Sequence, residues 1–360
     1  MSTQNLSAIR VEIDQLDIQI QELITKRAHL AQKVARAKGA EEENPSFYRP
    51  EREANILRQV ITRNEGPLSD ETLTRIFREI MSACLGLQKP MKIAFLGPAG
   101  TYSQAAVCKH FGHSAQHIPL QTIDEVFREV EANTVNYGVV PVENSTEGGV
   151  NQTLDCFIKS PLKICGEIEL PIHHHLLSKV SQLEQIKRIY SHSQSLAQCQ
   201  GWLDNHLPTI ERIAVNSNAE AARLTLEEPG TAAIAGQIAA DIYQLQIIAS
   251  RIEDNVNNTT RFAVLGKQEV SATGNDKTSL LLSNPNKPGV LYHLLEPFAK
   301  NHVNMTRVES RPSSHGIWEY LFFVDIEGHI KDPSIAKSLQ ILETHTSLIK
   351  HLGSYPSAIS

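Results

Sequence analysis

Two kinds of residue in this sequence could do chemistry: cations placed among apolar residues, and short polar side chains crowded at the ends of predicted strands. Arg27 is of the first kind, because it interrupts an apolar helical repeat between Leu23 and Leu30. A guanidinium in an apolar seam costs free energy unless it meets an anion. Lys38 lies only about 20° from Arg27 around such a helix. Both cations are therefore predicted to face one anion.

The second kind is concentrated in the stretch NVNNTTRF at residues 255–262, which leads into an apolar run. Asn and Thr gather where a chain leaves a turn and enters a strand, because their side chains satisfy nearby backbone groups. A plain turn is the simpler interpretation. At the lip of a strand, however, Thr260 could offer a hydroxyl donor and Arg261 could bind a carboxylate. This stretch alone leaves both interpretations open.

The composition describes a soluble protein of two or three domains: 360 residues, 41% hydrophobic and 21% charged. The net charge of -6 gives no reason to expect nucleic acid or an anionic membrane as a partner. The beginning of the chain lacks the features of a signal peptide, and the most apolar long window, residues 231–250, is interrupted by polar residues. We therefore expect a protein without membrane spans.

Five cysteines without a Cys-x-x-Cys pair favour the reducing cytoplasm over a disulfide framework or a zinc site. The three histidines at 173–175 would point to alternate faces of a strand, so at most two could converge on a metal. No metal is expected.

Three segments with different periodicities must position these residues. Residues 1–90 repeat apolar side chains every three to four positions, which predicts one long helix and two shorter ones beginning near Pro50 and Ser69. A coiled coil that only dimerises is the simpler interpretation of this segment.

Residues 91–270 alternate strand and helix patterns, which predicts two α/β lobes joined by two crossings, with a ligand between the lobes at the strand ends. Four polar motifs fall at such ends or at a crossing: GPAGTYS (97–103), PVENS (141–145), SHSQ (191–194) and TTRF (259–262). None is a nucleotide-binding fingerprint. Residues 271–360 begin with a polar linker and follow the order βαββαβ, which is the ferredoxin-like α+β arrangement.

The helical segment resembles the all-helical class of chorismate mutase in AIR (8–10), KR (26–27), VARAK (34–38), PERE (50–53) and the pair Cys84 and Gln88. This resemblance implies a domain-swapped dimer and a pericyclic reaction, which needs a compact substrate conformer and donors at the breaking ether bond. It implies that Arg27, Arg52 and the other chain's Arg10 bind carboxylates or the ether region. Lys38 and Gln88 would donate to the ether oxygen, and Glu53 would hold the ring hydroxyl. Arg49 and Cys84 would lie next to the substrate, where the family usually has an acidic residue and a serine.

The four polar motifs, in this order, resemble prephenate dehydratase, which forms phenylpyruvate by decarboxylation and loss of a hydroxyl without a cofactor. His192 could supply a proton or only stabilise its turn, and Ser193 stands where many relatives have proline. The resemblance implies that Thr260 donates a hydrogen bond to the departing hydroxyl and that Asn144 and Gln194 orient the substrate. The substrate carboxylates would be bound by Arg261 or by the turn that contains Thr101 and Ser103. Ser145 and Ser191 would also contact the substrate.

The C-terminal segment resembles the ACT domain in PGVL (288–291) and ESRP (309–312). It implies phenylalanine binding between paired domains by Gly289, Val290, Leu291, Glu309, Ser310 and Arg311.

The whole chain thus resembles a bifunctional enzyme of phenylalanine biosynthesis: mutase (1–90), dehydratase (91–270) and ACT domain (271–360). Feedback by phenylalanine and a homodimer through the N-terminal helices and the ACT domain, or a tetramer, are expected. Two alternatives are a sensor of small acids whose helices only dimerise, and an enzyme with a degenerate mutase.

Overall fold

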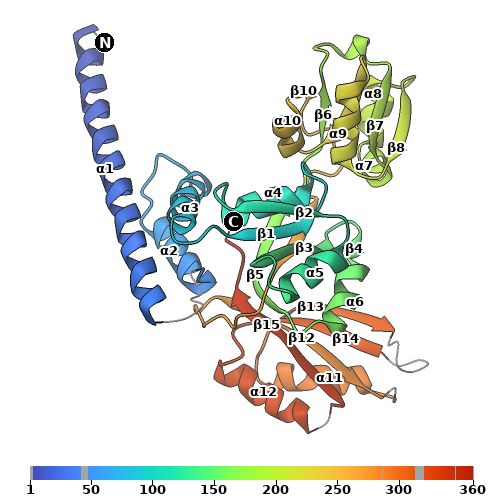
Figure 1. The fold of residues 1–360 in the computed structure, drawn as a ribbon. Helices are drawn as coiled ribbons and strands as arrows, with labels where there is room; N and C mark the ends of the chain where they lie inside the picture. The colour runs from blue at the N-terminus through green and yellow to red at the C-terminus, as the bar shows by residue number, and fades with distance from the viewer. Residues whose placement is uncertain (1–2, 42–47, 286, 313–319, 345, 360) are drawn as a thin grey trace.

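The computed structural model describes residues 3–41, 48–285, 287–312, 320–344 and 346–359. A helical module is followed by a two-lobed α/β unit and then by a helix-covered sheet (Figure 1). The predicted fold class is confirmed. Within the described ranges, none of the helices combines the length and apolarity that crossing a membrane would require.

The helical module consists of α1 (Thr3–Glu41), α2 (Pro50–Thr62) and α3 (Asp70–Gly86). Ser69 caps α3 as predicted, because its hydroxyl accepts a hydrogen bond from the Thr72 N–H at 3.2 Å. Pro50 occupies the start of α2, where a missing N–H costs nothing. The N-terminal half of α1 projects away from the rest of the molecule (Figure 1).

The first lobe is a mixed sheet in the order β2-β1-β3-β11-β5, with β4 paired to β3. The strands β1, β2 and β3 run parallel, whereas β11 runs antiparallel to both of its neighbours. The register places Thr260 opposite Asn144, where β11 begins and β3 ends. The lobe contains β1 (Lys92–Leu96), α4 (Tyr102–Phe111), β2 (Gln116–Leu120), α5 (Ile123–Glu131), β3 (Tyr137–Asn144), β4 (Gly148–Gly149), α6 (Asn151–Lys159), β5 (Lys163–Pro171) and β11 (Thr259–Gly266).

The second lobe has strand order β10-β6-β9-β7-β8, and the chain enters and leaves it through two crossings, residues 172–174 and 250–258. The SHSQ motif, expected as a turn, begins a helix instead, with His192 as its cap. The strands β2 and β10 were not predicted. The lobe contains β6 (His175–Ser178), the 3-10 helix η1 (Leu183–Gln185), β7 (Arg188–His192), α7 (Ser193–Gln198), α8 (Gln200–His206), β8 (Glu211–Val215), α9 (Asn218–Glu227), β9 (Thr231–Ala235), α10 (Gln237–Tyr243) and β10 (Gln246–Ala249).

The last domain is a four-stranded sheet in the order β13-β14-β12-β15. Its sheet also packs on the first lobe, where Leu281, Phe323 and Tyr355 share one buried core with Val140 and Phe157. The sheet of the last domain and the first lobe are therefore one packed unit. The domain contains β12 (Asp276–Asn284), α11 (Val290–Lys300), β13 (Met305–Pro312), β14 (Tyr320–Glu327), α12 (Pro333–Glu343) and β15 (Leu348–Pro356).

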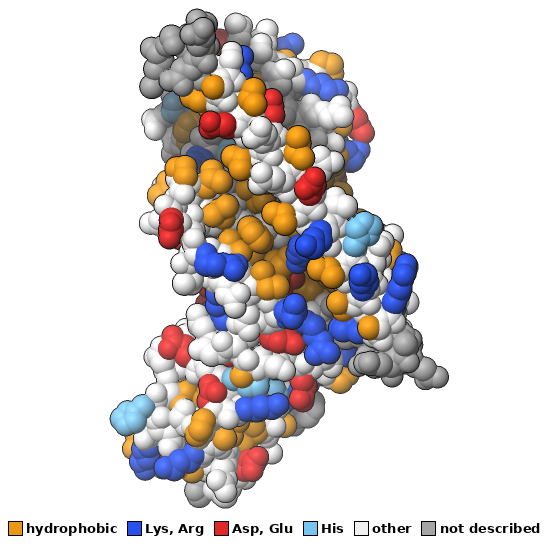
Figure 2. Space-filling view, turned by 90° about the vertical axis from the view of Figure 1, so that its left-hand side faces the viewer, with side chains coloured by type: hydrophobic (Ala, Val, Ile, Leu, Met, Phe, Trp, Pro, Cys, Tyr) orange, Lys and Arg blue, Asp and Glu red, His pale blue; other side chains and the backbone are white. Residues whose placement is uncertain are grey.

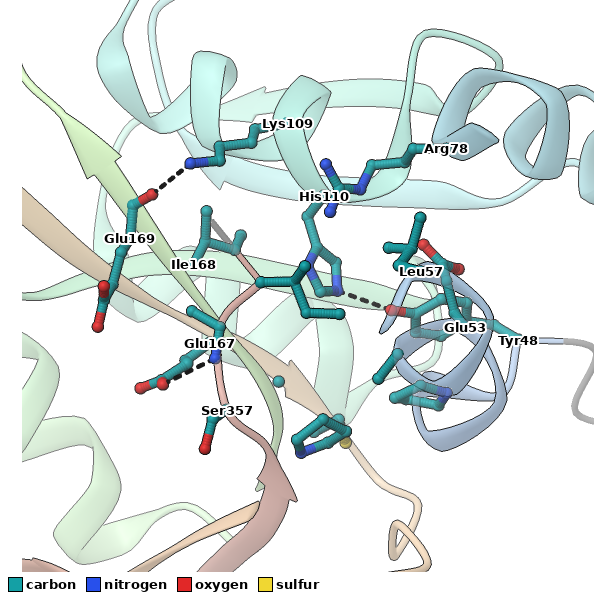
Figure 3. A pocket seen from close by; sticks show the side chains of 17 residues that line it. Tyr48, Glu53, Leu57, Arg78, Lys109, His110, Glu167, Ile168, Glu169 and Ser357 are labelled. Carbon is teal, nitrogen blue, oxygen red and sulfur yellow. Dashed lines mark hydrogen bonds between the residues drawn. The ribbon is translucent and has the colours of Figure 1, made fainter. Parts of the chain in front are cut away.

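The last strand, β15, continues into a C-terminal tail, residues 357–359. The tail helps to enclose a cavity of about 50 Å³ with α2, α4 and β5 (Figure 3). The backbone N–H of Ala358 donates to Glu167 Oε1 at 3.0 Å, and Tyr48 Oη lies 2.6 Å from His110 Nε2. All three parts of the chain meet at this cavity.

Candidate active sites

The helical module encloses a cavity of about 670 Å³ between the C-terminal half of α1 and the helices α2 and α3. The prediction that Arg27 and Lys38 face one space is confirmed, because both line this cavity. It is also lined by five more of the residues singled out in the sequence: Arg49, Arg52, Glu53, Cys84 and Gln88.

Arg10 does not line the cavity. It lies on the projecting half of α1, 17 residues before Arg27, which is about 25 Å along the helix axis. Within one chain it cannot reach the space that Arg27 faces. A site that uses Arg10 must therefore take it from a second chain.

The charges around the helical cavity favour a ligand with two negative charges. Arg27, Lys38, Arg49 and Arg52 outnumber the lining carboxylates of Glu51 and Glu53. Burial raises the pKa of Glu53 to about 7, against the opposing effect of the Arg78 and Arg27 guanidinium groups. At neutral pH one of the two carboxylates is thus partly protonated, which increases the positive excess.

The second site is a cleft of about 350 Å³ between the two α/β lobes. Residues from both lobes and both crossings line it. Those predicted from the sequence are Thr101, Ser103, Asn144, His192, Gln194 and Thr260, and those not predicted include Tyr102, His174, Gln198, Asn218 and Asn258.

The hydroxyl of Thr260 is held so that its proton points away from Asn144. The Asn144 Oδ1 atom accepts hydrogen bonds from Thr146 N, Thr146 Oγ1 and Glu147 N at 3.0, 2.6 and 3.2 Å. The amide nitrogen must therefore face Thr260, and it donates to Thr260 Oγ1 at 2.8 Å. Among the described residues we find no acceptor for the Thr260 proton, which is left for a ligand in the cleft.

Three of the predicted substrate-binding residues lie outside the cleft lining. Ser191 is fully buried, and its Oγ lies 2.9 Å from Asn218 Oδ1, so it supports a lining residue from below. Ser145 Oγ accepts from Thr259 N at 3.0 Å and ties β3 to β11. Arg261 points to the opposite face of β11 from Thr260, because side chains alternate along a strand. It forms an ion pair with Asp325 of the last domain, so its expected contact with a substrate carboxylate does not fit this geometry.

The same alternation redirects two residues of the predicted phenylalanine site. On β13, Arg307, Glu309 and Arg311 face the first lobe. Arg311 pairs with Asp155 of α6 at 2.7 Å, and the Glu309 carboxylate accepts from Arg307 and lies against Gly149. Glu309 and Arg311 are thus occupied between domains within one chain and are not free for a ligand.

The other members of that predicted site are more open. Gly289 caps α11 with φ of 82°, a left-handed conformation that suits glycine. The side chain of Leu291 is 40% exposed, Val290 is half-buried, and Ser310 is exposed on β13. These positions remain accessible to a ligand or to a second copy of the domain.

The fold and these sites define a multidomain enzyme of small carboxylic acids, with a cation-rich helical cavity, a two-lobed cleft built around a hydroxyl donor, and a third domain packed on the first lobe. Three family models match it in order: chorismate mutase type II over residues 9–89, prephenate dehydratase over 93–270 and the ACT domain over 278–344. The chain belongs to the bifunctional chorismate mutase/prephenate dehydratase family and catalyses both reactions.

Individual relatives support this assignment. The chain is 54% identical over 358 residues to the bifunctional chorismate mutase/prephenate dehydratase of Stutzerimonas stutzeri, which covers 98% of both chains. It is 36% identical to the prephenate dehydratase of Bacillus subtilis, over 74% of this chain and 99% of the relative. The crystal structure of the Arthrobacter aurescens prephenate dehydratase in complex with L-Phe superposes with a TM-score of 0.69 and 34% identity, covering 74% of this chain and 90% of that one.

The mutase reaction should respond to the ionisation of Glu53. Since the pKa of this carboxyl is raised to about 7, ionisation above that pH adds negative charge to a cavity that receives a dianion. We expect kcat/KM for chorismate, which reports groups of the free enzyme, to fall as pH rises through about 7.

Glu53→Gln should abolish this fall, because the amide does not ionise. A pH profile of the mutase step from pH 5 to 9 would measure the effect, with Glu51→Gln as the control that removes the other lining carboxylate. A decline that persists unchanged in Glu53→Gln would show that another group titrates.

Proposed function

We propose that the predicted residues that line the two sites, with Arg10 from a second chain, carry the two reactions and that phenylalanine, bound at the ACT domain, inhibits the enzyme. The single observation that supports the dehydratase assignment best is the Thr260 hydroxyl, whose oxygen accepts from Asn144 and whose proton faces the cleft. For the mutase it is the convergence of Arg27 and Lys38 on one cavity.

In the helical cavity, chorismate is held by its two carboxylates in a compact conformer. The reaction is pericyclic, so no proton is transferred and no covalent intermediate forms. The side chains of Lys38 and Gln88 donate to the ether oxygen, which gains negative charge as its bond breaks. Arg27 and Arg52 bind the carboxylates, Glu53 holds the ring hydroxyl, and Arg49 and Cys84 complete the wall.

In the cleft, the bond from the ring of prephenate to its carboxylate breaks and releases carbon dioxide. The electron pair of that bond makes the ring aromatic as the carbon–oxygen bond to the hydroxyl breaks. Thr260 donates a hydrogen bond to the departing oxygen and does not ionise, because a threonine hydroxyl is a poor acid. Asn144 orients Thr260. The rest of the substrate is bound by Gln194 and by the turn that contains Thr101 and Ser103.

Feedback by phenylalanine is supported by the contacts between the ACT domain and the cleft strands. Arg307 lies 3.4 Å from Glu143, the neighbour of Asn144 on β3. Asp325 pairs with Arg261, the neighbour of Thr260 on β11. A shift of the ACT sheet would therefore move both ends of the Thr260–Asn144 pair.

Supplying chorismate and following prephenate and phenylpyruvate with and without phenylalanine tests this function. We expect both products without phenylalanine and a lower rate of phenylpyruvate formation with it. Turnover that is unaffected by millimolar phenylalanine would rule out the feedback while leaving the two activities in place.

A homodimer is supported by the apolar surface of α1. Figure 2 shows apolar side chains gathered on the face where this helix lies. A surface of this extent and period is typical of a helix that packs against another copy. A second α1 covers it and brings its Arg10 to the cavity that this chain cannot reach alone. The exposed residues include Leu6, Ile9, Ile13, Leu16, Ile20, Leu23 and Leu30, each between 43% and 65% exposed.

Sharing of the mutase site between chains predicts complementation. Arg10→Ala and Lys38→Ala should each remove mutase activity, yet their heterodimer contains one site that carries neither substitution. Coexpression of the two variants should restore about a quarter of wild-type mutase activity, since random pairing makes half of the dimers mixed and one site in each is intact. Mixed dimers isolated with two tags that are no more active than the parents would contradict the shared site.

All five cysteines are free thiols, which supports a reducing, cytoplasmic location.

A further inference from the structure

A ring of hydrogen bonds lies beside Thr260 and runs in one direction. Gln198 Nε2 donates to Thr146 Oγ1 at 3.3 Å, and Thr146 Oγ1 donates to Asn144 Oδ1 at 2.6 Å. Asn144 Nδ2 donates to Asn258 Oδ1 at 2.8 Å, and Asn258 Nδ2 donates back to Gln198 Oε1 at 3.4 Å. Reversing one amide would set two donors face to face, and Asn258 is only 3% exposed, so water would not relieve the conflict.

The backbone N–H groups of Thr146 and Glu147 fix the direction of this ring at Asn144, and His174 holds it from outside. Its Nε2 lies 2.9 Å from Gln198 Oε1, which can only accept, so Nε2 carries the proton. Its Nδ1 then accepts from the Tyr102 hydroxyl at 2.7 Å, and the His173 carbonyl oxygen, at 2.8 Å, shares the same proton. Burial lowers the pKa of His174, against the hydrogen bond with Gln198 and the nearby Glu253 carboxylate, which favours this neutral form.

We propose that His174 is a positioning residue of the dehydratase: its Nε2–H group holds Gln198 and Asn258, and these hold the Asn144 amide in place beside Thr260, in the orientation that the Thr146 and Glu147 backbone sets. None of the four polar sequence motifs contains this histidine. The proposal rests on Thr260 being the donor to the departing hydroxyl.

The network around the Thr260 hydroxyl spans the two lobes. Tyr102 belongs to α4 of the first lobe, Gln198 to α7 of the second, and His174 and Asn258 to the two crossings. The ring of Tyr102 also packs on Gly236 of the second lobe, where an added Cβ would lie 2.7 Å from the tyrosine ring. The network thus joins both lobes and both crossings around the Asn144–Thr260 pair.

Steady-state kinetics on prephenate with the full chain test the proposal. We expect His174→Leu to lower kcat about tenfold or more, with KM within about twofold of wild type, because the directed donor acts in the transition state. His174→Gln should recover part of the loss, since its amide can donate to Gln198. In an Asn144→Ala background, His174→Leu should add little, because the link through which it acts is gone.

Mutase activity of the same variants reports whether the chain is intact. If His174→Leu loses that activity too, Tyr102→Phe takes its place, with a smaller fall in kcat and the same lack of additivity. Effects of His174 and Asn144 substitutions that multiply fully, or an unchanged kcat in His174→Leu, would overturn the role of His174. Near-normal kcat in Thr260→Ala would instead overturn the donor role of Thr260 and this proposal with it.

Discussion

Thr260→Ala is expected to lower kcat of the dehydratase by about 100-fold or more while the mutase rate stays within twofold of wild type. Loss of one preorganised donor to a developing negative charge typically costs about this much. We expect the full effect here, because the Thr260 hydroxyl is already oriented: the residue is only 9% exposed and Asn144 donates to its oxygen at 2.8 Å. Phenylpyruvate formation from prephenate measures the first rate and chorismate consumption the second.

Thr259→Ala is the matched control, because it removes the same methyl and hydroxyl from the neighbouring position, whose side chain is on the other face of β11. It should leave both rates near wild type. Thr260→Ser should retain most of the activity, since the hydroxyl is kept. If Thr260→Ala keeps a near-normal rate, the departing hydroxyl is assisted by another group.

Arg27→Ala should have the converse effect: chorismate rearrangement should slow by about 100-fold or more, with prephenate dehydration unchanged. The guanidinium faces the helical cavity and its Nη1 reaches the Ile80 carbonyl oxygen at 3.5 Å, so it is directed inward and is not a surface charge. Removing it leaves a substrate carboxylate without its charge-assisted partner inside the cavity. Assays of each step alone, with chorismate or prephenate supplied, separate the two activities.

Lys33→Ala serves as the control, because Lys33 is an exposed cation on the same helix that does not line the cavity. It removes one positive charge of α1 six residues from Arg27, which is about 9 Å along the helix axis. A comparable loss in both variants would mean that general electrostatic attraction, and not contact with the substrate, accounts for the effect of Arg27.

The convergence of the site residues could be predicted from the sequence because it follows from regular geometry. Helical spacing alone predicted that Arg27 and Lys38 face the same cavity. The order of strands and helices predicted that the polar motifs lie at one cleft. Gln198 could also have been found, since it lies one helical turn after Gln194 on α7 and so shares its face. His174 was considered only as a possible metal ligand, and its contact with Tyr102 joins segments 72 residues apart that no local pattern relates.

The residues whose predicted ligand contacts do not fit the structure are those that pair with another domain. Arg261 looked like a carboxylate ligand because it adjoins Thr260, but on a strand adjacent residues face opposite ways, and only the position of Asp325 reveals what it binds. The same holds for Glu309 and Arg311, which reach Gly149 and Asp155 of the first lobe. Packing between domains depends on distant pairs of surfaces, which periodicity within one segment does not encode.

The segment 357–359 has a consequence for how the protein unfolds. Its residues help to close the cavity where the helical module, the first lobe and the ACT domain meet. A contact shared by three parts couples their local stabilities, because loosening any one part removes a wall of the same cavity. We therefore expect amide hydrogens on all three sides of this cavity to exchange with solvent through a common opening.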